Sequence, residues 1–308
     1  MKTVMAWKKL ENGISVGHFN SVDSIPGFNC SQVYVKKIEA IDKNPEKAVT
    51  LFLLHDIGQY HGRFQSFIEW MRQRNPYVTF VCMDFVGHGL SSGTRGHFEQ
   101  FDSLVNDFHY LLEQFYKTKE NGERWILLGH GMGGLVALDL MNRFQDSVED
   151  KVDGLILSNF ILKFSSFLLR TDNISFFENG GISKILSHSR PLRIYRGHEI
   201  LSCPQAILNY EKDPMVIHRP TLNSIKEIQK RMVNVYHDSY FLSKPLMLIK
   251  SESGANLLSN GMDYFSRGIK KGLLMEKKYS LMKHDLYNER EKESVFEDIM
   301  NWMNTNEN

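Results

Sequence analysis

The chain has few cysteines, and their number and spacing argue against a disulfide-stabilised protein and against a structural metal site. Its 308 residues include Cys30, Cys82 and Cys203, which are far apart in the sequence. An odd number of widely spaced cysteines provides neither a disulfide framework nor the paired spacing of a structural metal site. We therefore expect reduced thiols, a cytoplasmic location, and no metal or cofactor.

The chain also lacks a charge excess and long hydrophobic runs. Lys plus Arg number 37 and Asp plus Glu 36, a net charge of +1 that gives no reason to expect a nucleic-acid partner. No stretch approaches the roughly 18 consecutive apolar residues of a transmembrane helix. The apolar run within residues 1–9 is too short for a signal peptide. Composition therefore predicts a soluble globular protein.

Short apolar runs alternate with amphipathic helical patterns along most of the chain. Strands are expected at residues 13–19, 31–38, 49–54, 77–83, 125–128, 153–157, 245–249 and 273–279, and helices at 63–74, 102–117, 134–142, 220–236, 257–269 and within 291–305. This alternation predicts an α/β fold with a mostly parallel sheet flanked by helices. It is interrupted between two strands, so we expect a core of residues 1–157 and 244–308 with an inserted helical cap at 158–243.

A glycine-rich turn follows the apolar run at 125–128. Gly129, Gly131 and Gly133 separate that strand from the next helical pattern. A strand, a sharp turn and a helix form the setting of the nucleophile elbow, whose pattern is G-x-S-x-G. Here the serine position is Gly131, which tolerates a strained turn but cannot attack a carbonyl.

Four further motifs occur in the same order as in one family of hydrolases. They are Asp84-x-x-Gly-His-Gly-x-Ser-x-Gly-x-Arg-Gly96, Gly58-x-x-x-Gly-Arg-Phe64, Tyr210-Glu-Lys-Asp-Pro214 and His284-Asp-Leu-Tyr-Asn-Glu289. With the glycine turn, they make residues 45–303 resemble the α/β-hydrolase superfamily, most closely the monoacylglycerol lipase and bacterial lysophospholipase group.

The resemblance implies specific roles for several residues. His284 occupies the position of the catalytic base, and the backbone N–H groups of Ile57 and Met132 occupy those of the oxyanion hole. Asp56 replaces the glycine that this group has after the histidine of its oxyanion loop. Two interpretations of Asp56 stay open, a neutral turn variant and a residue that changes the shape or electrostatics of the loop.

The position of the catalytic acid also carries glycine. Alignment without gaps from the strand at 245–249 places Gly254 there, 30 residues before His284. Glu252 lies two residues too early, a displacement of about 6–7 Å along a strand, and is a fallback acid. Asn159 is uncharged and cannot serve. Loss of two triad positions favours natural degeneration over an engineered replacement of one serine.

Three functional hypotheses follow. The first is a catalytically degenerate protein that binds a lipid-like or acyl ligand, or a protein partner, without turnover. The second is a serine esterase or lipase acting on lysophospholipid or monoacylglycerol, whose nucleophile is replaced by Gly131; serine at 131 alone would then restore turnover. The third is a non-hydrolytic enzyme that uses the oxyanion hole and His284 for proton transfer.

The start of the expected cap is rich in aromatic residues. Phe160, Phe164 and Phe167 are candidate ligand-binding residues because the cap of this group encloses an acyl chain. A simpler interpretation is that they pack the cap onto the core. Lys163 and Arg170 flank the run, which makes peripheral membrane contact a further alternative.

Overall fold

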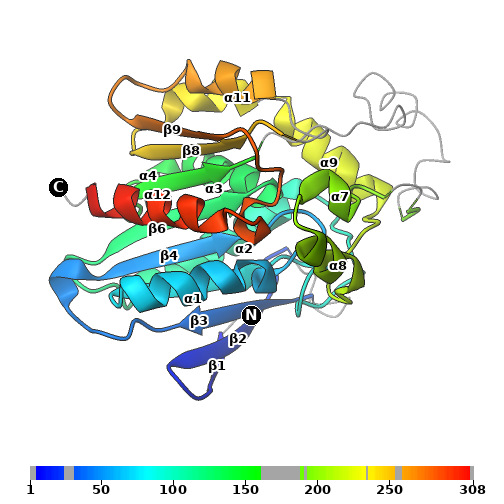
Figure 1. Ribbon diagram of the computed structural model, residues 1–308. Helices are drawn as coiled ribbons and strands as arrows, with labels where there is room; N and C mark the ends of the chain where they lie inside the picture. Colours follow the sequence, from blue (N-terminus) through cyan, green and yellow to red (C-terminus); the bar gives the residue numbers. More distant parts are fainter. Residues whose placement is uncertain are drawn as a thin grey trace.

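The computed structural model describes residues 5–23, 31–160, 188–190, 193–233, 235–253 and 259–305. Within them the chain forms one nine-stranded sheet in the order β1-β2-β3-β5-β4-β6-β7-β8-β9 (Figure 1). The strands are β1 (Ala6–Lys9), β2 (Ile14–Asn20), β3 (Gln32–Ile38), β4 (Val49–Leu54), β5 (Val78–Asp84), β6 (Arg124–His130), β7 (Gly154–Ser158), β8 (Leu246–Ser251) and β9 (Leu274–Tyr279). From β5 to β9 along the sheet all neighbours are parallel, whereas β1, β2 and β3 add antiparallel pairs.

Helices cover both faces of the sheet, and others lie beyond one of its ends. The described helices are α1 (Gln65–Arg74), α2 (Phe101–Tyr116), α3 (Met132–Arg143), α4 (Gln145–Val148), α7 (Gly197–Ile200), α8 (Pro204–Lys212), α9 (Leu222–Met232), α10 (Val235–Asp238), α11 (Ser259–Ser266) and α12 (Lys292–Thr305). The predicted α/β-hydrolase fold, a mostly parallel sheet with helices on both sides, is confirmed. Several details differ. The elements β1, α4, α7 and α8 were not expected, β6 continues to His130 into the expected glycine turn, and the helix expected at 220–236 is divided into α9 and α10.

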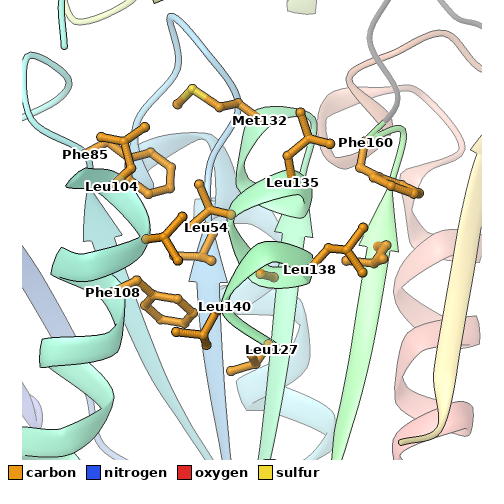
Figure 2. Close-up of a cluster of buried hydrophobic side chains, with 14 of the residues drawn as sticks. Leu54, Phe85, Leu104, Phe108, Leu127, Met132, Leu135, Leu138, Leu140 and Phe160 are labelled. Atoms are coloured by element: carbon orange, nitrogen blue, oxygen red, sulfur yellow. The ribbon is translucent and has the colours of Figure 1, made fainter. Parts of the chain in front are cut away.

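The central strands are buried on both faces, which explains their uninterrupted apolar sequences. In β4, Phe52 and Leu54 face the layer of α2 and α3, while Leu51 and Leu53 face the layer of α1 and α12. Successive side chains of a strand point to opposite faces, so a strand covered on both sides needs apolar residues throughout. Figure 2 shows Leu54 between the α2 side chains Leu104 and Phe108 and the α3 side chain Leu135.

The segment between β7 and β8 contains α7, α8, α9 and α10. Figure 1 shows α7, α8 and α9 beyond one end of the sheet, on the side where the loops after the parallel strands lie. The boundaries of the cap, 158–243, stay a prediction. Among the described helices, none combines the length and the apolar character needed to cross a membrane.

The buried carboxyl group of Asp107, in the middle of α2, makes the stability of the fold depend on pH. The side chain is buried, and its Oδ1 accepts the N–H of Val22 at 2.7 Å. Burial raises the pKa of Asp107 from 3.8 to about 7. Between about pH 4 and pH 7 the unfolded chain therefore loses a proton that the folded chain keeps, so stability falls as pH rises, by about 1.4 kcal/mol per unit.

We expect Asp107→Asn to remove this loss of stability. An amide oxygen can still accept the N–H of Val22, and the buried group no longer ionises. At pH 8 the variant should be more stable than the wild type in urea denaturation, while at pH 4 the two should be similar. Asp102→Asn, an exposed change on the same helix, is the matched control. An unchanged pH dependence in Asp107→Asn would show that the prediction is wrong.

Candidate active site

The turn between β6 and α3 leaves no room for a side chain at residue 131. Gly131 has φ 52° and ψ −121°, in the left-handed region that favours glycine. Its N–H donates to the carbonyl of Ser158 at 2.9 Å, which ties the turn to the end of β7. A Cβ atom at this position would overlap Cγ and both oxygens of the Asp56 carboxylate. Glycine at 131 is therefore favoured by its backbone conformation, and the Asp56 carboxylate leaves no room there for any other residue.

The Asp56 carboxylate bridges the groups that the resemblance assigns to catalysis. Its Oδ1 accepts the N–H groups of Ile57 at 2.7 Å and Met132 at 2.8 Å, the two expected oxyanion donors. Its Oδ2 lies 2.8 Å from Nε2 of His284. Asp56 and His284 are 0% and 1% exposed. The structure thus brings His284, Gly131 and both amides together around a carboxylate whose position the sequence did not reveal.

The surroundings of Asp56 keep its carboxylate ionised at neutral pH. Burial alone would raise the pKa of Asp56, but the hydrogen bond and charge of His284, with smaller contributions from His130 and the N–H of Met132, lower it overall. A buried anion that receives three hydrogen-bond donors is stabilised as a charge-assisted network. The interpretation of Asp56 as a neutral turn variant does not account for this geometry.

The loop that carries His284 is held by buried polar contacts. Asp285 forms an ion pair with Arg63, with Oδ2 and Nη2 2.6 Å apart. The Asn159 amide nitrogen donates to the carbonyl of His284 at 2.9 Å and to Oγ of Ser251 at 3.0 Å. Asn159 therefore connects the ends of β7 and β8 to the histidine loop, a positioning role that sequence reasoning missed when it considered Asn159 only as an acid.

The other predicted site residues lie in different surroundings. Phe160 is buried in the core, where its ring centroid lies 4.9 Å from that of Phe265. Glu252 is exposed at the end of β8, and its N–H donates to the carbonyl of Tyr279. Three predicted residues fall outside the described part of the chain: Gly254, Phe164 and Phe167. The ligand-binding role of the phenylalanines stays a prediction.

Among the described residues, two clusters have the residue types and spacing to hold a metal ion. Candidate ligand atoms lie within 4.8 Å of one another in each: Asp56, His130 and His284 form one, and His97, Glu99 and His188 the other. In the first cluster both Asp56 oxygens already have hydrogen-bond partners within the protein. The expectation of no metal stays a prediction.

Comparisons with known proteins agree with this architecture. The model of the family Hydrolase_4, described as "Serine aminopeptidase, S33", matches residues 44–291. Phospholipase YtpA of Bacillus subtilis is 21% identical over 258 residues, which cover 82% of this chain and 94% of that protein. A monoacylglycerol lipase of Mycolicibacterium smegmatis is 20% identical over 273 residues, 85% of this chain and 89% of that protein.

Solved structures share the fold at low sequence identity. The Paleococcus ferrophilus monoacylglycerol lipase superposes with a TM-score of 0.72 at 20% identity, covering 89% of this chain and 99% of that chain. A soluble variant of Saccharomyces cerevisiae monoglyceride lipase, solved with a substrate analog, gives 0.75 at 18% identity, with coverage of 93% and 96%. Because the family model spans most of its length, the chain belongs to the Hydrolase_4 (serine aminopeptidase S33) family, as a lysophospholipase- and monoacylglycerol-lipase-like α/β hydrolase.

Proposed function

We propose that this chain is a catalytically degenerate member of its family that binds a lipid-like or acyl ligand without hydrolysing it through a serine. One observation carries the proposal: the Asp56 carboxylate fills the oxyanion hole beside Gly131. A tetrahedral intermediate needs both N–H groups for its developing negative charge, and removal of one such donor costs about 10²–10³-fold in rate. Here both donors are occupied, and by an anion that would repel the oxyanion.

The ligand class rests on the relatives. A phospholipase and a monoacylglycerol lipase each align with more than four-fifths of this chain. The proposed cap, residues 158–243, would enclose the ligand, with Phe164 and Phe167 as candidate contacts. A protein partner in place of a lipid is the alternative within the same hypothesis.

A serine esterase that has lost only its nucleophile is the competing function. It would act on lysophospholipid or monoacylglycerol and recover turnover when serine returns at 131. The contacts around Asp56 disfavour it, because any side chain at 131 overlaps that carboxylate. A non-hydrolytic enzyme that uses the oxyanion hole and His284 is disfavoured as well, since Oδ1 of Asp56 occupies both N–H donors of that hole.

Ester hydrolysis tests the first part of the proposal. We expect the wild type to hydrolyse short p-nitrophenyl esters at the rate of a His284→Ala control and to remain unlabelled by a fluorophosphonate. Rapid hydrolysis that His284→Ala abolishes would refute the proposal.

Ligand binding needs a separate measurement. Native mass spectrometry of the purified chain, before and after incubation with a monoacylglycerol and a lysophosphatidylcholine, should show a retained acyl species of unchanged mass. A chain that retains neither lipid would contradict the ligand class, and release of free fatty acid would contradict the absence of turnover.

A further inference from the structure

The two oxygens of the Asp56 carboxylate have different surroundings. Oδ1 has both of its lone-pair directions occupied by the N–H groups of Ile57 and Met132. Oδ2 has one described partner, Nε2 of His284, and so keeps a lone pair for another group. The carboxylate also takes the volume of a side chain at 131, the nucleophile position of the elbow.

We propose that Asp56 is itself a nucleophile, which attacks an epoxide carbon through Oδ2 and forms an ester with the ring-opened substrate. Carboxylates of Asp and Glu serve as nucleophiles in covalent catalysis. The Oδ2–carbon bond forms as the epoxide carbon–oxygen bond breaks, and the epoxide oxygen leaves as an alkoxide that takes a proton. This activity lies beyond the proposed function and does not require a serine.

The occupied oxyanion hole decides which electrophile suits this carboxylate. Attack on an acyl carbonyl would create a new oxyanion on the substrate, and both N–H donors are already used by Oδ1. Attack on a saturated carbon creates no such oxyanion at the carboxylate. A strained or activated saturated carbon is therefore the matching class of substrate.

The N–H groups of Ile57 and Met132 also suit the second step, which is hydrolysis of the ester on Asp56. In the ester, Oδ1 becomes the carbonyl oxygen and stays in the hole. Water that loses a proton to His284 attacks Cγ, and the negative charge develops on Oδ1 between the donors of Ile57 and Met132. The tetrahedral intermediate then breaks its Cγ–Oδ2 bond, the departing oxygen takes the proton from His284 and leaves as the diol, and the second proton of the water returns to the Tyr195 phenolate. The diol keeps the former Oδ2 atom, and the oxygen from water stays in the Asp56 carboxylate.

Tyr195 is the candidate donor of the proton to the departing alkoxide. Its side chain is buried, with a ring centroid 5.1 Å from that of His284, and its hydroxyl has no hydrogen-bond partner among the described residues. Burial, and to a lesser extent the charge of Asp56, raises the pKa of Tyr195 well above 10, so the phenol keeps its proton as a donor. A buried, unpaired donor beside an anionic nucleophile needs an acceptor, which an epoxide oxygen supplies.

Incubation of the intact chain with 1,2-epoxydodecane tests the proposal. We expect a covalent adduct of one epoxide per chain, located on Asp56 by peptide mass spectrometry, or release of the diol with ¹⁸O from labelled water in the Asp56 carboxylate. His284→Gln should accumulate the adduct because water is no longer activated. Tyr195→Phe should slow ring opening by about 100-fold, whereas the exposed change Tyr240→Phe should leave the rate unchanged.

The outcome is read on the wild-type chain, so it does not depend on how well a variant folds. Asp56→Asn, verified as folded by circular dichroism, should form neither adduct nor diol. Absence of both adduct and diol in the wild type, or modification of other residues that Asp56→Asn leaves unchanged, would overturn the proposal. Either result leaves the ester-hydrolysis test unaffected, so the two proposals can fail separately.

Discussion

Gly131→Ser alone is expected to destabilise the fold by about 3 kcal/mol and to leave the protein without fluorophosphonate labelling. Even the Cβ atom of a serine would overlap the Asp56 carboxylate, which is fixed by two backbone N–H groups and His284. Overpacking a buried site typically costs 1–3 kcal/mol or somewhat more. Urea denaturation measures the loss of stability, and gel fluorescence measures the labelling.

The matched variant removes the obstruction. Asp56→Gly with Gly131→Ser should regain stability relative to the single serine variant and react with the probe, because His284 then faces the serine hydroxyl and the oxyanion hole is free. Adding Gly254→Asp should raise ester turnover strongly, since loss of the triad carboxylate costs about 10⁴-fold in a serine protease. If Gly131→Ser alone reacts as fast as the double variant, Asp56 does not block the site.

Asp56→Ala is expected to lower the free energy of unfolding by about 3–5 kcal/mol. It leaves the buried Nε2 of His284 and the N–H groups of Ile57 and Met132 without their acceptor. Asp56→Asn is the control: its amide oxygen can accept both N–H groups, and its NH₂ takes the position of Oδ2 beside Nε2 of His284. We expect the asparagine variant to lose only about 1–2 kcal/mol.

Urea denaturation at pH 7 compares the two variants. A difference of less than about 1 kcal/mol between alanine and asparagine would mean that the hydrogen bonds of Asp56 contribute little. The comparison also separates the polar contacts from the loss of side-chain volume, because only alanine shortens the side chain.

Most of the fold could be predicted because apolar runs and helical periods are local properties. The run at 49–54 is almost entirely apolar because β4 is buried on both faces, and such a run can be recognised from the sequence alone. β1 was missed because Ala6–Lys9 is a short, exposed edge strand with no apolar alternation. The break between α9 and α10 was missed because the helical period of residues 220–236 continues across it.

The site was only partly predictable, for a different reason. Motif order placed His284, Ile57 and Met132 in one region, and the structure brings them within hydrogen-bond reach of one carboxylate. Asp56 and Gly131 are 75 positions apart, so the fit of an added carboxylate into the space of a missing side chain exists only in three dimensions. A departure at two facing positions is the signal that could have been pursued, since Asp56 and Gly131 each differ from the family pattern.

A crystal structure of the wild-type chain at neutral pH would test the central claim most directly. We expect Oδ1 of Asp56 within hydrogen-bond distance of the N–H groups of Ile57 and Met132, and Oδ2 within hydrogen-bond distance of His284, with no side-chain density at 131. A carboxylate turned away from the two N–H groups, with water in the oxyanion hole, would contradict the account.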